Sequence, residues 1–374
     1  MHLTKGEEKI LQGEDGEAAQ KAMELLVALG EIYRAEKLID VASVQVSGVS
    51  HATIGDAGLD FLEDLASKGA KARVSATINP AGIDLERWKK LGFKESFARK
   101  QLRIVRAYEA MGMLPSYTCT PYLIGNLPRF GEHIAWAESS SVVFANSVLG
   151  ARTNRESAVS ALASALLGKT PYYGLHLEEN RKGTFTVEVE AELRSEADYS
   201  ALGYYVSNYE GVPLFKNISP GAEELKALSA ALGVGKINMF QIPGITPESG
   251  SEKGEKMEFG RDELREVYEK LNSADEVDAI CIGCPHCSAA EILKIEQLKP
   301  EREVWAFTAR KNKPLIEKRI KNIKVIYDTC MVVSPLRDLG IEAVGVNSAK
   351  AAFYCANLSK LRVRFDSLKN LVKS

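Results

Sequence analysis

Apolar and polar residues alternate with two different periods in the first 80 residues, and each period predicts a different kind of element. Apolar residues that recur every three or four positions predict a helix, whereas strict alternation predicts a strand. In order, the predicted elements are a helix over 18–29 that ends at Gly30, a strand over 41–47, a glycine- and serine-rich loop over 47–55, a helix over 57–67 and a strand over 72–77. This segment therefore reads as a strand–helix–strand unit.

The same alternation of strands and helices returns in the last hundred residues. It predicts strands over 277–282, 304–308, 323–327 and 342–346, with helices over 289–298 and 313–318. Ser288 and Glu291 form a capping-box pattern at the start of the helix over 289–298. Such alternation favours an α/β fold whose sheets are largely parallel.

The middle of the chain is less regular. Residues 183–191 alternate like a half-exposed strand, and the turn-rich, charged stretch 242–256 is the best linker candidate. We therefore expect one N-terminal α/β region over 1–245, with room for two intertwined subdomains, and a C-terminal α/β domain over 260–374 that carries a cysteine-rich loop.

Two shorter elements are predicted between residues 138 and 168. The polar stretch Glu138-Ser-Ser-Ser141 precedes an apolar run over 142–145 that reads as a strand. A helix is predicted over 157–167, with Asn154 as its N-cap and Gly168 as its end.

Composition describes an ordinary globular chain. Of the 374 residues, 45% are hydrophobic and 26% charged, and 48 Lys and Arg nearly balance 50 Asp and Glu. These values disfavour disorder and a nucleic-acid partner. The polar N-terminus does not resemble a signal peptide, and no segment approaches the roughly 18 apolar residues of a membrane span. We therefore expect a cytoplasmic protein with no membrane partner, whose six cysteines are reduced.

The cysteines are the unusual feature of the composition. Cys281, Cys284 and Cys287 form one CxxCxxC run that closes the strand predicted over 277–282, and Cys330 follows the strand over 323–327. Ligands bind at the carboxyl ends of parallel strands, so thiolates from both loops can meet there. Cys119 lies in a third polar loop and could join them, whereas Cys355 lies in an apolar run and reads as a core residue.

Four interpretations of these thiols remain open at this point. They are core packing, a zinc site, a dithiol redox pair and an iron–sulfur cluster. Only one CxxC pair is present where structural zinc usually takes two, whereas a cluster accepts thiolates from separate loops. A cluster held by three thiolates leaves one iron free to bind a substrate hydroxyl and carboxylate as a Lewis acid. Dehydratases use this chemistry.

Other polar residues give weaker signals. Arg152 and Arg155 precede the helix over 157–167, where they could bind a carboxylate or a phosphate, or could simply be solvated. His51 lies in the glycine- and serine-rich loop and His286 in the cysteine-rich loop, so both are candidate site residues, but neither has the spacing of a metal-binding pair. The chain has neither the GxSxG motif of a serine nucleophile nor a GxxxxGK[ST] phosphate loop.

In order and combination, seven segments spread over nearly the whole chain resemble the aconitase X family, and within it the archaeal phosphomevalonate dehydratase branch. The segments are Ser47–Gly58, Ala76–Asp84, Thr118–Tyr122, Glu138–Asn154, Gly283–His286, Asp328–Cys330 and Gly345–Lys350. The resemblance implies aconitase-like three-layer α/β domains with mostly parallel sheets, and it implies that the swivelling domain of aconitase is a separate small subunit.

The resemblance also implies an activity and a site. The activity is dehydration of mevalonate 5-phosphate, a phosphorylated hydroxy acid, to trans-anhydromevalonate 5-phosphate in a modified mevalonate route to isoprenoids. The implied cofactor is a 4Fe-4S cluster on Cys119, Cys284 and Cys330, with Cys281 and Cys287 as neighbours. The catalytic base is expected on the small subunit of a heterodimer. The residues expected to bind substrate are Ser47, His51, Asn79, Ser140, Asn146, Ser147 and Arg152.

Two alternative functions remain. A cis-3-hydroxy-L-proline dehydratase of the same family would share the fold and the cluster but would need no phosphate site. A redox or iron-sensing protein would use the cluster, or a Cys281–Cys284 dithiol, to switch partner binding, and a fourth cluster ligand would distinguish it.

Overall fold

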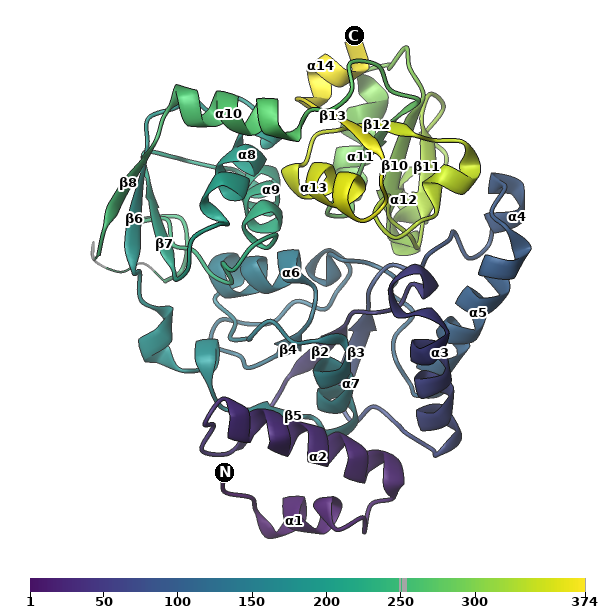
Figure 1. The fold of residues 1–374 in the computed structure, drawn as a ribbon, viewed down its shortest axis with the longest axis vertical. Coiled ribbons are helices and arrows are strands. Elements are labelled where there is room, and N and C mark those ends of the chain that lie inside the picture. The colour runs from purple at the N-terminus through teal and green to yellow at the C-terminus, as the bar shows by residue number, and fades with distance from the viewer. Residues whose placement is uncertain (249, 251–253, 374) are drawn as a thin grey trace.

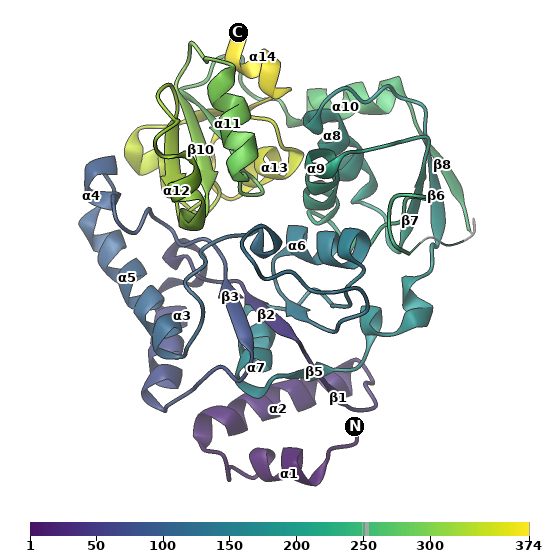
Figure 2. The same ribbon diagram turned by 180° about the vertical axis from the view of Figure 1, so that it is seen from behind.

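Three parallel β-sheets organise the chain in the computed structural model, which describes residues 1–248, 250 and 254–373. The first sheet lies among the N-terminal helices, and the second and third sheets form two further lobes beside each other (Figures 1 and 2). A short antiparallel pair, β1 (Leu38–Asp40) with β5 (Lys169–Pro171), is added to the first lobe. The predicted α/β class with mostly parallel sheets is confirmed.

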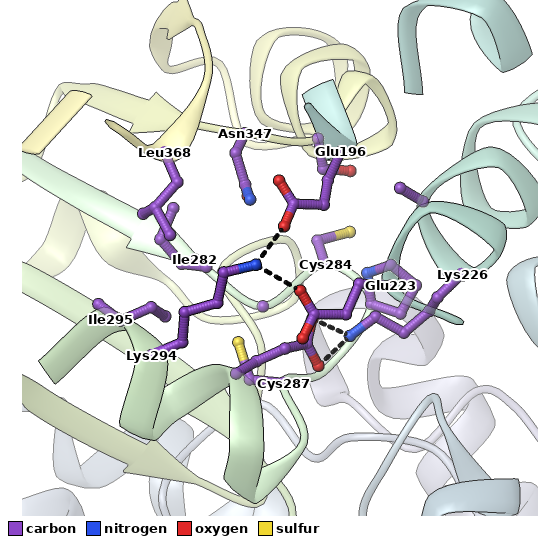
Figure 3. Close-up of a pocket in the computed structure, with 15 residues that line it drawn as sticks. Glu196, Glu223, Lys226, Ile282, Cys284, Cys287, Lys294, Ile295, Asn347 and Leu368 are labelled. Atoms are coloured by element: carbon purple, nitrogen blue, oxygen red, sulfur yellow. Dashed lines mark hydrogen bonds and ion pairs between the residues drawn. The ribbon is translucent and has the colours of Figure 1, made fainter. Parts of the chain in front are cut away.

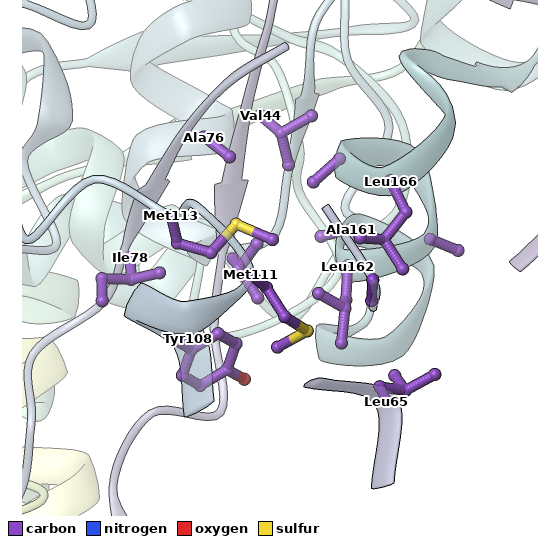
Figure 4. Packing of buried hydrophobic residues seen from close by; sticks show 14 of the residues in the cluster. Val44, Leu65, Ala76, Ile78, Tyr108, Met111, Met113, Ala161, Leu162 and Leu166 are labelled. Atoms are coloured by element: carbon purple, nitrogen blue, oxygen red, sulfur yellow. The ribbon is translucent and has the colours of Figure 1, made fainter. Parts of the chain in front are cut away.

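The first sheet has the order β3-β2-β4 and is parallel throughout. Its strands are β2 (Ser43–Val46), β3 (Ser75–Ile78) and β4 (Ala135–Trp136). Apolar side chains of β2 and β3 pack against α7 (Ala158–Leu167) and against the end of α5 (Glu95–Ala110), as Figure 4 shows. The other helices of this lobe are α1 (Lys5–Leu11), α2 (Glu17–Ile32), α3 (His51–Ser67) and α4 (Trp88–Leu91).

The second sheet, β7-β6-β8, is also parallel. It consists of β6 (Phe185–Val189), β7 (Pro213–Lys216) and β8 (Lys256–Phe259), with helices α8 (Glu196–Val206), α9 (Ala222–Leu232) and α10 (Arg261–Leu271). Residue 256, the last of the predicted linker, is thus the first residue of a sheet strand. Positions 249 and 251–253 of that linker lie outside the described residues.

The third sheet has five parallel strands in the order β11-β10-β9-β12-β13. They are β9 (Ala279–Ile282), β10 (Val304–Thr308), β11 (Lys324–Tyr327), β12 (Ala343–Val346) and β13 (Arg362–Phe365). One apolar cluster joins the sheet to α11 (Ala289–Gln297), α12 (Lys313–Ile316) and α14 (Leu368–Lys373). A second cluster joins it to α13 (Ala349–Asn357) and α10, so this lobe has three layers.

Three local predictions were wrong. The apolar run 142–145 is helical, in α6 (Ser139–Phe144) and the π-turn over 145–149, because Glu138 caps the first turn; a short apolar run does not distinguish a strand from a buried helix. Helix α3 starts at His51, inside the predicted loop, with a kink at Gly55. Helix α2 continues past Gly30, whose missing side chain leaves room for Met1.

The start of α7 also differs from its prediction. Ser157, rather than Asn154, caps this helix, through a reciprocal bond with Ser160. Asn154 instead donates to the Tyr173 carbonyl and accepts from the Leu175 N–H. The predicted end of the helix at Gly168 and the capping box of Ser288 and Glu291 are both confirmed.

The strand order of the third sheet reverses between β9 and β12, which makes that point a topological switch where a crevice opens beyond the strand ends. In the first sheet β2 lies between β3 and β4, the next two strands of that sheet. The chain therefore leads to opposite sides of β2, as it does at the switch point of the third sheet. None of the described helices is long and apolar enough to cross a membrane.

Candidate active site

A cavity of about 440 Å³ lies between the carboxyl ends of the first and third sheets. Ser47, Asn79 and Glu138 reach it from the loops after β2, β3 and β4. From the third sheet, Cys284 follows β9 and Cys330 follows β11. Two sheets that are separate along the chain therefore place the ends of five strands around one space.

Three thiols line this cavity, and they come from three different loops: those of Cys119, Cys284 and Cys330. Each residue is less than a tenth exposed. Burial raises the pKa of Cys119 to about 12 and that of Cys330 to about 11, and it raises the pKa of Cys284 as well. Burial outweighs the lysine charge nearby, so these thiols stay protonated, whereas a metal would displace their protons.

His286 connects the three cysteine loops to one another. Its ring Nδ1 lies 3.0 Å from the hydroxyl of Thr118, next to Cys119, and its Nε2 lies 2.9 Å from the carbonyl of Thr329, next to Cys330. Its own backbone N–H donates to Cys119 Sγ at 3.2 Å. Burial lowers the pKa of His286 to about 4, so the ring is neutral and fixes the spacing of the loops.

Asp84 and Arg310 fix the Cys330 loop to the first sheet. Arg310 follows β10, and its guanidinium contacts Asp84, 2.8 Å away in the loop after β3, and Asp328, 2.7 Å away, two residues before Cys330. The Ala81 N–H donates to the Asp328 carbonyl at 2.7 Å. Although burial alone would raise the pKa of Asp84, its arginine partners hold it below the usual value, so the ion pairs persist at neutral pH.

A buried polar chain forms the other side of the cavity. Gln45 donates to both the Thr118 carbonyl and the side-chain oxygen of Asn79, and Asn79 Nδ2 donates to Glu138 at 2.7 Å. Lys350, the second residue of α13, is ion-paired with Glu138 and donates to Ser139 Oγ at 3.0 Å. Burial by itself lowers the pKa of Lys350, but the Glu138 carboxylate outweighs burial, so Lys350 is a cation.

Comparison with known proteins identifies the family. Models described as the first, second and third domains of aconitase X match residues 1–179, 183–269 and 277–374. The chain belongs to the aconitase X family. It is 50% identical to the phosphomevalonate dehydratase large subunit of Methanocaldococcus jannaschii, with both chains covered completely.

Two further aconitase X relatives extend the comparison. The crystal structure of aconitase X (holo-form) from Thermococcus kodakaraensis superposes over both whole chains with a TM-score of 0.93 at 44% identity. The cis-3-hydroxy-L-proline dehydratase of Pseudomonas aeruginosa is 34% identical over 98% of this chain, which spans 69% of that longer protein. The aconitase X fold expected from the sequence is thus confirmed.

The structure brings only some of the predicted substrate-binding residues of this aconitase X chain to the cavity. Ser47 and Asn79 line it, whereas His51 does not, and its ring pairs with Asp56 at 2.9 Å. Ser140 does not line the cavity either, and its hydroxyl donates to Glu138 at 3.1 Å.

Asn146, Ser147 and Arg152 are not among the residues that line the cavity. Asn146 donates to the carbonyls of Thr153 and Asn238, Ser147 accepts from the backbone N–H of Phe240, and Arg152 donates to the His176 carbonyl. These side chains hold the segment after α6 against its neighbours. Glu138, Lys350 and His286 line or support the cavity, and the sequence reasoning gave none of them a defined role in binding substrate.

The remaining cysteines lie elsewhere in the aconitase X fold. Cys281 and Cys355 are fully buried in the apolar cluster between the third sheet and α13, so the expectation that Cys355 is a core residue is confirmed. Cys287 faces a second, smaller cavity behind the Cys284 loop (Figure 3). There Lys226 of α9 is ion-paired with Glu291 of α11 and donates to the His286 carbonyl at 3.2 Å.

The three thiols fit a cluster better than a single ion. Two thiolates on one zinc ion lie at most about 4.6 Å apart, twice the usual Zn–S bond. Among the described residues, no group of three His, Cys, Asp or Glu side chains is arranged to hold one metal ion. An iron–sulfur cluster accepts thiolates from separate loops, and these three thiols come from three separate loops.

Proposed function

We propose that this chain is the cluster-binding large subunit of a dehydratase that converts mevalonate 5-phosphate to trans-anhydromevalonate 5-phosphate. One observation supports the proposal above others: three thiols from separate loops line one cavity, in a chain that matches a phosphomevalonate dehydratase large subunit from end to end. Dehydration is the chemistry that such a donor set serves when a cluster is bound.

Cys119, Cys284 and Cys330 would hold a 4Fe-4S cluster through one thiolate each. Three ligands would leave one of four irons without a protein ligand, and that iron would supply Lewis acidity toward the substrate hydroxyl and carboxylate. The thiols are arranged for this role by the His286 bonds and by the Arg310 ion pairs, which fix the relative positions of their loops. The relative from Thermococcus kodakaraensis is itself a holo-form.

The chain's other residues bind the substrate and exclude water. Ser47 and the Asn79–Glu138–Lys350 chain provide the polar side of the cavity. Val49, Ile54, Val333 and Leu358 provide an apolar side, which favours the methyl and methylene groups of the substrate and lowers the local dielectric. Glu138, the one carboxylate that lines the cavity among the described residues, is already paired with Lys350, so we assign the catalytic base to a small partner subunit.

The partner assignment draws on two relatives. The Methanocaldococcus jannaschii protein is named a large subunit, which implies a small one. This chain spans 69% of the longer cis-3-hydroxy-L-proline dehydratase, so almost a third of that protein has no counterpart in it. We infer that a separate small subunit supplies the corresponding part here and closes the cavity.

Activity of the assembled enzyme tests this function. The chain is reconstituted anaerobically with iron and sulfide, combined with its small subunit, and offered mevalonate 5-phosphate or cis-3-hydroxy-L-proline in separate reactions. Formation of trans-anhydromevalonate 5-phosphate is the expected result. Turnover of the proline substrate alone would assign the chain to the other branch of the family, and an intact cluster with no turnover of either would favour a redox or sensing role.

A further inference from the structure

Lys226 contacts the cysteine loop from the rear cavity, whose volume is about 40 Å³ (Figure 3). Its side chain is 9% exposed and comes from α9 of the second lobe, whereas the loop follows β9 of the third. It does not line the cavity that we assign to the substrate. Because apolar side chains of similar size often stabilise a fold as well as a buried ion pair does, stability alone does not account for this lysine.

The ion pair of Lys226 with Glu291 holds the cysteine loop at two points. Lys226 donates to the carbonyl of His286 at 3.2 Å. Glu291 accepts from the backbone N–H of Ser288 at 2.8 Å, at the start of α11. These two points lie two and four residues after Cys284, so the second lobe fixes the segment that follows this proposed cluster ligand.

His286 connects the contact with Lys226 to a second proposed ligand. The carbonyl of His286 accepts from Lys226, and the backbone N–H of the same residue donates to Cys119 Sγ at 3.2 Å. A displacement of the carbonyl would therefore also move the N–H away from the sulfur. A hydrogen bond to a thiolate stabilises its negative charge, so Lys226 helps to hold a bond that favours the charged form of Cys119.

The charge of Lys226 acts on the same place. Burial by itself lowers the pKa of Lys226, but the Glu291 carboxylate outweighs burial, so Lys226 is a cation. The same lysine interacts electrostatically with Cys287 and Cys119. Salt screens buried charges much less than exposed ones, so this cation would still be felt by an anionic cluster at physiological ionic strength.

We propose that Lys226 is a positioning residue through which the second lobe raises the reduction potential of the bound 4Fe-4S cluster and slows the loss of its iron. The proposal rests on the proposed function in taking Cys119, Cys284 and Cys330 as cluster ligands. Hydrogen bonds to sulfur and nearby positive charge both favour the reduced cluster, which carries one more negative charge. The bond held through His286 and the charge of Lys226 therefore act in the same direction.

Four variants separate this role from general stability. Lys226→Met removes the bond and the charge, whereas Lys226→Arg keeps both, and the rear cavity gives room for the larger side chain. Arg181→Met is the matched control, because Arg181 is 1% exposed and paired with Glu248, outside the cysteine loops. Lys294→Met removes a 54% exposed lysine that joins α11 to α8 and α9 in the same rear cavity through Glu196 and Glu223.

The reduction potential of the cluster is the first readout. Each variant is reconstituted anaerobically with iron and sulfide, combined with the small subunit, and titrated with dithionite while electron paramagnetic resonance follows the reduced cluster. For Lys226→Met we expect the equilibrium constant for one-electron reduction to fall about tenfold, which lowers the midpoint by about 59 mV. Lys226→Arg should restore most of this change, and both controls should stay within about twofold of the wild type.

The rate at which a chelator removes iron is the second readout. It should rise about tenfold in Lys226→Met, with recovery in Lys226→Arg, because partners that orient metal ligands typically change metal affinity by this amount or more. Lys226→Gln, which can still donate to the His286 carbonyl but has no charge, should lie between Met and the wild type in both readouts. An unchanged potential and release rate in Lys226→Met, or equal changes in Arg181→Met, would overturn the proposal.

The proposed function is judged separately, from turnover by the wild type. If the wild type carries a cluster but converts neither mevalonate 5-phosphate nor cis-3-hydroxy-L-proline, the proposed function fails, while the Lys226 comparison still decides the positioning role. If the wild type dehydrates mevalonate 5-phosphate and the variants show no shift, only the positioning role fails. If the reconstituted wild type binds no cluster, both are refuted.

Discussion

Arg310 joins the loops that follow β3 and β11, and replacing it with methionine tests how the Cys330 loop is held. The guanidinium lies 2.8 Å from Asp84 and 2.7 Å from Asp328 and stacks on the ring of Tyr327. Asp84 is completely buried and Asp328 nearly so, whereas the Arg310 side chain is 23% exposed. Methionine keeps part of the apolar contact with Tyr327 but leaves both carboxylates without this cation.

The expected cost follows from this geometry. Removing one partner of a buried ion pair destabilises a protein by about 3–5 kcal/mol. Arg87 still pairs with Asp84 after the change, and Arg310 is partly screened by water, so we expect about 3 kcal/mol, at the low end of that range. Because Asp328 is two residues before Cys330, iron retention should fall together with stability.

The assay is urea denaturation of the apo chain followed by tryptophan fluorescence, with iron per chain measured separately after reconstitution. Lys94→Met is the control, because Lys94 pairs with Asp338 across the same two lobes but is 63% exposed. An exposed pair contributes at most about 1 kcal/mol, so this control should shift the first unfolding transition little. Equal small shifts in both variants, with normal iron content, would refute the view that the Arg310 ion pairs hold the cysteine loop.

Three further changes test separate parts of the structure. The Cys119→Ser variant should bind little iron on reconstitution while its circular dichroism shows that it is folded. The Cys355→Ser variant should bind iron normally but melt at a lower temperature. A full cluster in Cys119→Ser would contradict the ligand assignment. Gly283→Ala should destabilise the chain by more than Gly340→Ala. Both glycines have positive φ, but only at Gly283 would a Cβ lie 2.4 Å from a carbonyl oxygen of β10. Similar urea midpoints for the two variants would count against this reasoning. Burial lowers the pKa of His176 to about 3, so the unfolded chain, with a pKa of about 6.5, takes up a proton that the native chain excludes. Stability should therefore fall as pH drops from 6.5 toward 3, by up to about 1.4 kcal/mol per pH unit for this group, and His176→Gln should flatten that slope in urea titrations.

Strand positions were predictable because the third sheet is buried on both faces, and its strands are short apolar runs between turn residues. Knowing where β9 and β11 end was enough to place Cys284 and Cys330 near each other. The same signal failed for α6, because four apolar residues in a row fit a buried helix as well as a strand. There the capping carboxylate of Glu138 decided the outcome.

Polar side chains were harder to assign than strands. Arg152 looked like an anion ligand because it stands before a helix, and the family resemblance implied that Asn146 binds substrate. Both side chains instead donate to backbone carbonyls, Asn146 to that of Asn238 and Arg152 to that of His176. Lys350 gave a usable signal, since it is a charged residue among the small apolar residues that open α13. A lysine in such surroundings needs a buried counterion, and only the tertiary structure shows that Glu138 provides it.

Most of the polar and thiol side chains that reach the cavity stand beyond the ends of strands, whereas Cys119 reaches it from an irregular loop. Ser47, Asn79, Glu138, Cys284 and Cys330 all follow the carboxyl end of a parallel strand. Asn146 and Ser147 come a full helix later, beyond α6, where the chain has already left the edge of the first sheet. Because the second sheet contributes no strand end to the cavity, its substitutions should act on stability and on the rear ion pairs and should leave substrate binding intact. Lys226 belongs to α9 of that lobe but contacts the Cys284 loop. A substitution there is therefore the strictest test of whether the second lobe affects stability alone.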